Sequence, residues 1–214
     1  MLTRRTFIAA SALGLAAGRA GAQALGEATA PGPLVLDVAP EALDAGLALP
    51  PDTDGDFVIP EAYRARVVDV APGLPLSSIH IVPASYNLYF VLPGDQAIRY
   101  GVAVGQEGLG WRGAATIGRK AEWPSWRPTD EMIARNPGQY AQYADGMPGG
   151  PGNPLGARGI YFYQGERDTM IRIHGTIAPA TIGTSASNGC FRMYNSHVID
   201  LYERVPLGTQ AYVY

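Results

Sequence analysis

A single cysteine and one histidine are the residues of this sequence whose types and surroundings suggest covalent chemistry. Cys190 is the only cysteine among 214 residues, His174 is one of three histidines, and a glycine adjoins each of them. A thiolate attacks carbonyl carbons, but a free thiol, with a pKa of about 8.5, is mostly protonated at neutral pH. An imidazole within hydrogen-bond distance removes that proton, and the glycines allow the backbone to approach a substrate closely. We therefore interpret Cys190 as a nucleophile and His174 as its general base.

Purely structural roles for Cys190 and His174 are the simpler alternative. A lone cysteine is most often a small buried apolar residue, and a lone histidine in a strand is most often a hydrogen-bonded structural residue. Here the two residues occur in segments 171–176 and 187–195, both of which contain glycine and polar residues. Their combination places the chemical interpretation on an equal footing with the structural one.

These two segments resemble the catalytic signature of the L,D-transpeptidases, the bacterial cell-wall enzymes with a YkuD-type catalytic domain. That signature is His-Gly or His-Ser on a strand, a spacer, Ser-His-Gly-Cys, a hydrophobic residue, and Arg or Asn. The sequence matches it with His174-Gly175-Thr176 and with Ser187-Asn188-Gly189-Cys190-Phe191-Arg192. Asn188 stands where the commonest pattern has a second histidine, and an asparagine forms hydrogen bonds but carries no proton. Because the general base is the first histidine, the resemblance implies that the chemistry is retained.

The resemblance extends from about Ile79 to Tyr214, which makes it more specific than the short signature. It includes three further stretches, Tyr89–Gly94, Gly118–Pro124 and Gly149–Arg158. It implies a mainly β fold with a few short helices, arranged as an L,D-transpeptidase-like β-sandwich or barrel with a long inserted lid-like loop. Abundant glycine (27) and proline (18) also favour strands and long loops over a helix bundle.

The resemblance also implies a reaction and a set of site residues. The Cys190 thiolate attacks the diaminopimelate–D-Ala carbonyl of a peptidoglycan tetrapeptide stem, and an amine then resolves the thioester. The backbone carbonyl of Gly175 orients His174, replacing the carboxylate of a familiar triad. Backbone N–H groups near Gly189 and Cys190 stabilise the oxyanion. Carbapenems are expected to acylate the same thiol.

The other residues of the signature are expected to contact the substrate. Arg192 binds or positions an anionic substrate group or braces the loop, with a surface salt bridge as the alternative. The remaining pocket residues are Ser187, Asn188, Gly189 and Thr176. No metal and no cofactor are expected, because the histidines and the cysteine are too widely separated in sequence to suggest a tetrahedral site.

Two other functions remain compatible with the sequence. A hydrolase on the same scaffold, an L,D-carboxypeptidase or endopeptidase, would use water to resolve the thioester. An inactive wall-binding homologue is the other alternative, for which Asn188 is the only indication. The acyl acceptor is also open: a second stem peptide, a free D-amino acid and an outer-membrane lipoprotein are the candidates.

Residues 1–24 have the organisation of an export signal. Arg4 and Arg5 precede an apolar run that ends near Ala17, and Ala22-Gln23-Ala24 offers an A-x-A cleavage site. The paired arginines resemble the twin-arginine signal, with an ordinary secretory peptide as the alternative. Both routes lead out of the cytoplasm, so we expect a periplasmic protein. The apolar run is too short for a transmembrane helix, and none is expected in the mature chain.

The composition of the mature chain excludes one class of partner. Removal of residues 1–24 leaves 13 basic and 19 acidic residues, a formal net charge of −6. An acidic chain without a basic stripe is not expected to bind nucleic acid. A lone cysteine in an oxidising compartment cannot form an internal disulfide, which marks Cys190 as a reactive thiol.

The remaining chain divides into a linker or arm at residues 25–76 and a catalytic domain at 77–214. Within the arm, residues 57–76 are expected to form an edge strand or to pack on the domain. Alternating apolar residues predict further strands, and the turn Pro93-Gly94-Asp95 predicts a hairpin between the first two of them. The expected strands are 87–92, 97–104, 159–163, 169–173 and 211–214.

Residues 105–158 are predicted to be a long irregular region, which forms either a lid or a small satellite core. It contains all three tryptophans, Trp111, Trp123 and Trp126, and a short helix at 129–135 capped by Thr129. A second helix is expected after Asn195, which is assigned as its N-cap, with Val198, Leu201, Tyr202 and Val205 at helical spacing. His197 is expected to be a surface or capping residue, and His80 is assigned no role.

Overall fold

The computed structural model describes residues 47–105, 110–185 and 191–214. The predicted export signal, residues 25–46 of the arm, and Ser187, Asn188, Gly189 and Cys190 lie outside the described residues. Strands dominate the described residues, with a few short helices, as expected. No helix in the described ranges is both long and apolar enough to cross a bilayer.

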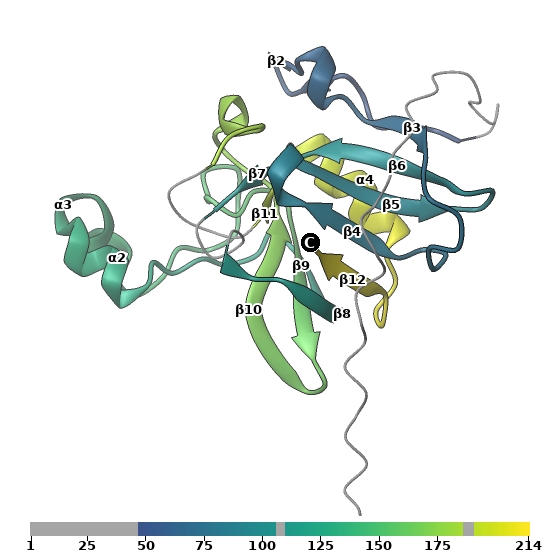
Figure 1. Cartoon of the computed structure of the whole chain (residues 1–214). Helices are drawn as coiled ribbons and strands as arrows, with labels where there is room; N and C mark the ends of the chain where they lie inside the picture. The colour runs from purple at the N-terminus through teal and green to yellow at the C-terminus, as the bar shows by residue number, and fades with distance from the viewer. Residues whose placement is uncertain (1–46, 106–109, 186–190) are drawn as a thin grey trace, which may run out of the picture.

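A mixed ten-stranded sheet accounts for most of the structure, and a two-stranded ribbon, β1–β2, precedes it (Figure 1). The strands are β1 Thr53–Asp54, β2 Phe57–Val58, β3 Arg66–Asp69, β4 Ile79–Val82, β5 Asn87–Leu92, β6 Gln96–Gly101, β7 Ala103–Val104, β8 Gly113–Glu122, β9 Arg158–Gln164, β10 Arg167–His174, β11 Phe191–Arg192 and β12 Gln210–Val213. The helices are η1 Glu61–Tyr63, η2 Pro83–Ser85, α2 Asp130–Arg135, α3 Pro137–Tyr140, η3 Ala141–Tyr143, η4 Pro179–Thr181 and α4 Asn195–Arg204.

The order of the strands shows that the sheet curls back on itself. The order is β3-β6-β5-β4-β12-β8-β9-β10-β11-β7, so β6 and β7 stand second and last. In the chain, however, only Val102 separates the end of β6 from the start of β7. A flat sheet would place these two strands roughly 38 Å apart, at about 4.8 Å per strand. The sheet must therefore close almost completely, as the expected sandwich or barrel requires.

One hydrophobic cluster fills the interior of the curled sheet. Ile79, Phe90 and Ile98 from one half pack in the same cluster as Ile173 and Phe191 from the other half. The helix α4 completes this core, because Val198 and Leu201 are fully buried on one helical face, as is Val205, the C-cap residue that follows the helix. The helical spacing predicted for Val198 and Leu201 is confirmed, whereas Val205 lies one residue beyond the end of the helix.

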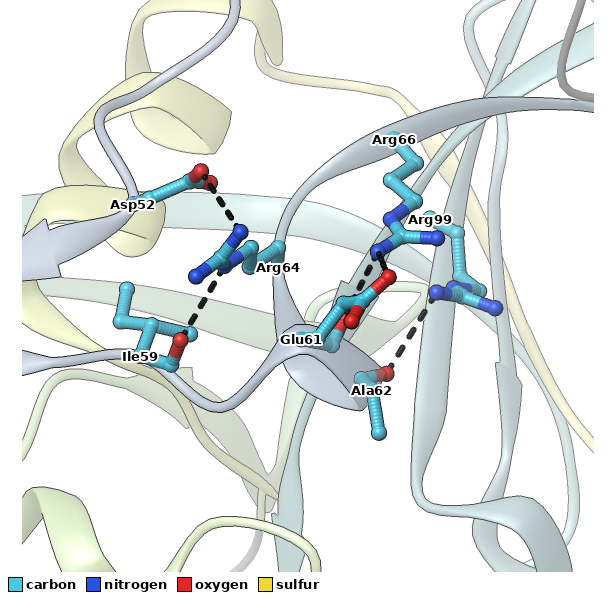
Figure 2. Close-up of polar contacts among 7 residues, drawn as sticks. All are labelled: Asp52, Ile59, Glu61, Ala62, Arg64, Arg66 and Arg99. Atoms are coloured by element: carbon cyan, nitrogen blue, oxygen red, sulfur yellow. Dashed lines mark hydrogen bonds and ion pairs between the residues drawn. The ribbon is translucent and has the colours of Figure 1, made fainter.

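The described part of the N-terminal arm packs on the sheet and on α4. The strand β3 pairs antiparallel with β6 as an edge strand, as the sequence suggested for this region. Figure 2 shows the polar contacts that attach the arm to itself and to β6: Arg64 with Asp52 and the Ile59 carbonyl, Arg66 with Glu61, and Arg99 with the Ala62 carbonyl. These ion pairs are exposed or partly exposed, so each contributes little stability on its own.

The arm also provides a cap for α4. The N-cap residue Tyr194 has no capping side chain, and instead the carboxylate of Asp54 accepts a hydrogen bond from the backbone N–H of Ser196 at 2.9 Å. At the other end of the helix, Arg204 donates to the backbone carbonyl of Ala48 at 2.6 Å. The arm therefore runs along α4 and contacts both of its ends.

The hairpins are confirmed, with one correction to the strand boundaries. The pairs β5–β6 and β9–β10 are antiparallel hairpins at the predicted positions. The run 97–104 is not one strand, because Val102 divides β6 from β7 and the chain crosses there to the other end of the sheet. Alternation continues through this point, so the local pattern contains no sign of the crossing.

The prediction that residues 105–158 are irregular throughout is wrong. The ten-residue strand β8 lies at the centre of the sheet between β12 and β9. Its pairing with β9 shifts between Ile117 and Arg119, and the ring of Tyr163 occupies the space beside Gly118 where a Cβ would stand. Because this bulge breaks the alternation of side chains, the sequence pattern did not reveal the strand.

The inserted segment is consequently shorter, from Trp123 to Ala157, and it projects from the sheet as α2 and α3 (Figure 1). The predicted cap is confirmed, since Thr129 Oγ1 accepts from the Met132 N–H at 3.2 Å. The rings of Tyr140 and Tyr143 both pack edge-on against Trp126. This aromatic group forms a small satellite cluster, and its role as a lid stays a prediction.

Candidate active site

The strand β10 presents His174 at its C-terminal end, as predicted. Ile171 and Ile173 point into the main core, so Arg172 and His174 lie on the opposite face of the strand. On one side β10 pairs with β9, where Gly159 stands opposite His174. On the other side it pairs in parallel with β11, where Arg192 stands beside His174.

A hydrogen bond to the next residue fixes the ring of His174. Its Nδ1 lies 2.7 Å from the backbone carbonyl oxygen of Gly175. A carbonyl oxygen only accepts, so Nδ1 carries the proton and Nε2 of the neutral ring keeps its lone pair. The ring therefore has the tautomer that a general base requires, and a backbone carbonyl holds it.

Burial keeps the imidazole of His174 neutral. The residue is only 4% exposed. Removal from water lowers its pKa to about 4, against the opposing effect of the Gly175 hydrogen bond. The positive charges of Arg192 and Arg172 lower the pKa further. At neutral pH the ring is consequently unprotonated and able to accept a proton.

The strand β11, which begins one residue after the predicted nucleophile, pairs with the end of β10 that carries His174. Phe191 pairs with Ile173, and the N–H of Met193 donates to the carbonyl of His174 at 2.8 Å. Cys190 itself lies outside the described residues, as do Ser187, Asn188 and Gly189. It is joined to Phe191 by one peptide bond.

The assignment of Asn195 as the N-cap of α4 is wrong. Asn195 is the first residue of the helix, and its carboxamide points away from the helix backbone toward two loops. Its Oδ1 accepts from the N–H of Ala157 at 2.9 Å, and its Nδ2 donates to the carbonyl of Thr176 at 2.7 Å. The helix start was located correctly, but the side chain bridges segments that are distant in sequence.

Two glycines allow this bridge to form. Gly156 has φ of +62°, and a Cβ there would stand 2.6 Å from the Thr176 nitrogen and overlap Asn195 Oδ1. A Cβ on Gly175 would also overlap Asn195 Oδ1 and lie 3.0 Å from the Ala157 nitrogen. The carbonyl that holds His174 therefore belongs to a tightly packed turn, which we call the Asn195 clamp: Gly156, Ala157, Gly175, Thr176 and Asn195.

Of the predicted substrate-binding residues, the structure describes Thr176 and Arg192. Thr176 is buried, and its hydroxyl accepts from the N–H of Ala178 at 3.0 Å, which shapes the turn after His174. Arg192 is half-buried beside His174. Their predicted contacts with a substrate stay predictions.

The histidines outside the signature are both buried. The expectation that His197 is a surface or capping residue is wrong, because it is fully buried between the rings of Tyr100 and Tyr194. Its helix turns that face toward the sheet, a consequence of tertiary packing that helical spacing alone does not reveal. His80 lies on β4, hydrogen-bonded to Ser78 Oγ at 2.8 Å and to Tyr214 OH at 2.7 Å.

Among the described residues, no metal cluster includes His174, and one cavity of the fold lies away from it. Among the described residues, no three His, Cys, Asp or Glu side chains are grouped so as to hold a metal ion. A cavity of about 340 Å³ is lined by residues 75–78 and 206–210, none of which is a predicted site residue.

Residues 77–213 match the family described as YkuD, L,D-transpeptidase catalytic domain. The chain belongs to this family. The recognition made from the signature is confirmed, as is the enzyme class at the level of the family. The domain boundaries, the export signal and the roles of individual residues stay predictions.

Relatives of known name have the same assignment. A probable L,D-transpeptidase ErfK/SrfK of Escherichia coli strain K12 is 29% identical over 67% of this chain and 46% of the relative. A putative L,D-transpeptidase of Fuscovulum blasticum, from the ATP synthase subunits region, is 39% identical over 48% of this chain and 49% of the relative. The chain spans about half the length of the curated relatives it matches.

A similar solved structure is a crystal structure described as a probable carnitine operon oxidoreductase from Brucella melitensis. It is 54% identical to this chain, with a TM-score of 0.51, over 70% of this chain and 92% of that protein. The word oxidoreductase describes the Brucella melitensis protein and is not transferred to this chain. At this identity the likeness supports a shared fold for the two proteins.

Proposed function

We propose that this protein is an exported L,D-transpeptidase that acts on peptidoglycan in the periplasm. The observation that carries the proposal is the neutral, buried His174, fixed through Nδ1 by the Gly175 carbonyl at 2.7 Å. The strand β11 runs beside His174, and we assign Cys190, the residue immediately before β11 in the sequence, as the nucleophile.

In the proposed reaction, Nε2 of His174 takes the proton of the Cys190 thiol. The thiolate attacks the carbonyl at the diaminopimelate–D-Ala bond of a tetrapeptide stem, and the Gly189 and Cys190 N–H groups stabilise the oxyanion. The histidinium returns its proton to the nitrogen of D-Ala, which leaves. An acceptor amine then attacks the thioester and gives one proton to His174; the new amide forms as the C–S bond breaks, and the histidinium returns that proton to the Cys190 sulfur.

The low pKa of His174 affects the two proton transfers in opposite ways: it makes the imidazole a weaker base toward the thiol and the imidazolium a stronger acid toward the leaving amine. A neutral imidazole accepts the thiol proton, and the resulting imidazolium, in a buried site near two guanidiniums, is a strong acid. It therefore returns the proton readily to the leaving amine. No carboxylate is needed in this arrangement, because the Gly175 carbonyl orients the ring.

The roles of the remaining signature residues belong to the same proposal. Arg192 positions an anionic group of the substrate, and Ser187, Asn188, Gly189 and Thr176 shape its pocket. Residues 1–24 act as the export signal, by the twin-arginine route. The acceptor is a second stem peptide, a D-amino acid or an outer-membrane lipoprotein.

Acylation of the purified protein by a carbapenem, followed by intact-protein mass spectrometry, tests the nucleophile. We expect one covalent adduct on the wild type and none on Cys190→Ala. We expect His174→Ala to be acylated more slowly at neutral pH, with partial recovery at alkaline pH as the thiol ionises by itself. An unreactive wild type would favour the inactive wall-binding alternative, and an unchanged rate in His174→Ala would remove His174 as the base.

Product analysis with a tetrapeptide stem separates transfer from hydrolysis. Cross-linked dimers, formed by the wild type and absent with Cys190→Ala, are the expected result. Shortened monomers as the sole product would show an L,D-carboxypeptidase instead. Addition of a D-amino acid to the same reaction tests that acceptor directly, because exchange products differ in mass from dimers.

A further inference from the structure

A tyrosine flanked by two arginines crosses three neighbouring strands on the face of the sheet that carries His174. Tyr161 on β9 stands opposite Arg172 on β10 and opposite Arg119 on β8. Because directly opposite residues of antiparallel strands point to the same side, these three side chains share one face. We call this row the arginine–tyrosine strip: Arg119, Tyr161 and Arg172.

Both guanidiniums of the strip lie against the same aromatic ring. The Cζ atom of Arg119 is 4.3 Å and that of Arg172 is 5.0 Å from the centroid of Tyr161. Tyr161 is only 3% exposed, whereas Arg119 is exposed and Arg172 is half-buried. The ring therefore acts as a buried platform that orders two charged groups while leaving their polar edges accessible.

The strip lies next to His174 on the same face of the sheet. Residues 159 and 161 lie on the same face of β9, and Gly159 stands opposite His174. A Cβ on Gly159 would lie 3.0 Å from Tyr161 Cε2 and 3.2 Å from its hydroxyl oxygen. The tyrosine ring thus leans over Gly159, toward the strand position that His174 occupies. The same positive charge acts on His174, because Arg172 contributes to its lowered pKa.

In the described part of the chain, neither guanidinium of the strip forms an ion pair with a carboxylate. Arg172 has one weak contact, from Nη2 to the sulfur of Met170 at 3.7 Å. Two positive charges held on one ring repel each other, and an anion placed between their exposed edges would relieve that repulsion.

Two other cations on β8 and β9, Lys120 and Arg158, have partners of a different kind from those of the strip. The ammonium of Lys120 donates to the carbonyls of Tyr202 and Val205 at the end of α4. Arg158 pairs with Glu122 at 3.4 Å. These two cations also lie over a ring, that of Tyr202, but Lys120 has two carbonyl partners and Arg158 a carboxylate partner, whereas the guanidiniums of the strip have no carboxylate partner among the described residues.

We propose that the arginine–tyrosine strip is a carboxylate-binding subsite that holds an acidic peptide across β8–β10 with its reacting bond at His174. This inference rests on the proposed function and names the feature of the substrate that the enzyme recognises. A guanidinium binds a carboxylate through two parallel N–H donors, which fixes direction as well as affinity. The strip thus selects stem peptides that carry a free carboxylate on the residues preceding the reacting bond.

The test compares a synthetic tetrapeptide stem with the same peptide whose free side-branch carboxylates are converted to carboxamides. Acylation of the full-length protein is followed by mass spectrometry, giving kcat and KM for each peptide. We expect amidation to raise KM about tenfold for the wild type, the size of one lost charged hydrogen-bond pair. In Arg119→Gln and Arg172→Gln that discrimination falls to about twofold or less.

Arg167→Gln is the matched control. Arg167 is an exposed arginine on β10, the strand of Arg172, at the end remote from His174. Its replacement by glutamine removes the same unit of charge as Arg172→Gln. It should retain the full preference for the free carboxylate. Equal loss of preference in all three variants would indicate a general charge effect and overturn the subsite, as would unchanged discrimination in Arg119→Gln and Arg172→Gln.

Binding to Cys190→Ala keeps the inference testable if the proposed reaction fails. In this variant the dissociation constants of the two peptides are measured at low and high salt. Weaker binding of the amidated peptide, abolished by Arg172→Gln, supports the subsite even when no acylation occurs. Equal binding of both peptides overturns the subsite and leaves the transpeptidase proposal to be judged by acylation alone.

Discussion

The carboxamide of Asn195 is hydrogen-bonded to the backbone carbonyl of Thr176, with a distance of 2.7 Å from Nδ2 to the oxygen. Its other end accepts from the N–H of Ala157 at 2.9 Å. Thr176 follows Gly175, whose carbonyl orients His174. The first residue of α4 therefore positions the catalytic turn without contacting the imidazole.

Replacing Asn195 by alanine should disturb the turn and leave two backbone groups without partners. The expected loss is about 1–3 kcal/mol in the free energy of unfolding, because the Ala157 N–H and the Thr176 carbonyl are partly buried. The rate of Cys190 acylation should fall as well, since the Gly175 carbonyl is no longer held. Chemical denaturation and carbapenem acylation measure the two effects.

Asn195→Asp is the diagnostic companion variant. One carboxylate oxygen still accepts from Ala157, but the other faces the Thr176 carbonyl, where only a protonated acid forms a hydrogen bond. The pKa of this carboxyl is raised in the folded state. The free energy of unfolding of Asn195→Asp should therefore fall short of the wild-type value by less as the pH falls. A deficit independent of pH would show that Asn195 acts merely by filling space.

Gly156→Ala should disrupt the same turn from the opposite side. Gly156 has φ of +62°, and an added Cβ would stand 2.6 Å from the Thr176 nitrogen. The strained backbone alone costs about 1–3 kcal/mol, and the overlap adds to it. Gly152→Ala is the control, because a Cβ there meets no atom within 4 Å. We expect a lower melting temperature and slower acylation for Gly156→Ala, and wild-type behaviour for Gly152→Ala.

The elements that were predicted correctly are those whose determinants are local. The β5–β6 hairpin follows from alternation on both sides of the turn at Pro93-Gly94-Asp95, and Thr129 caps α2 through the N–H of Met132, three residues on. His174 was found from its signature, and its strand from alternating residues. In each case the residues that decide the structure are neighbours in the sequence.

What was missed depends on partners distant in the chain. The strand β8 is disguised by a bulge at Gly118, where the Tyr163 ring fills the position of a side chain. The Asn195 side chain has the composition of an N-cap, but it bonds to residues 19 and 38 positions away. The arginine–tyrosine strip exists only because three strands align Arg119, Tyr161 and Arg172. Tertiary pairing, which one sequence does not display, creates all three features.

The cap that Asp54 supplies to α4 predicts that the N-terminal arm stabilises the catalytic domain. Asp54→Ala removes the acceptor for the Ser196 N–H and should cost about 0.5–2 kcal/mol, the usual value of a helix cap. Asp56→Ala is the control, since Asp56 is exposed and lies two residues away on the same ribbon. Equal stability of the two variants, measured by urea denaturation, would show that the arm contributes no cap.

His197 provides a prediction about acid sensitivity. Burial lowers its pKa to about 4, although Asp54, Asp200 and Asp52 oppose the shift. Between pH 6.5 and 4 the unfolded chain therefore binds a proton that the folded protein excludes, so the free energy of unfolding falls as the pH falls. His80 and His174, whose pKa values are also lowered to about 4, act in the same direction.

His197→Phe should remove one of these three contributions. Within the described residues, neither ring nitrogen of His197 has a hydrogen-bond partner, and its neighbours are the rings of Tyr100 and Tyr194. The difference in the free energy of unfolding between the variant and the wild type should be on the order of 2 kcal/mol more favourable to the variant at pH 5 than at pH 7.5, because one histidine no longer takes up a proton on unfolding. His80→Phe is the contrasting variant, because it breaks the bonds to Ser78 and Tyr214 and should lose stability at pH 7.5. Denaturation curves at both pH values decide the matter: an equal difference between His197→Phe and wild type at pH 5 and 7.5 would show that His197 does not titrate in this range.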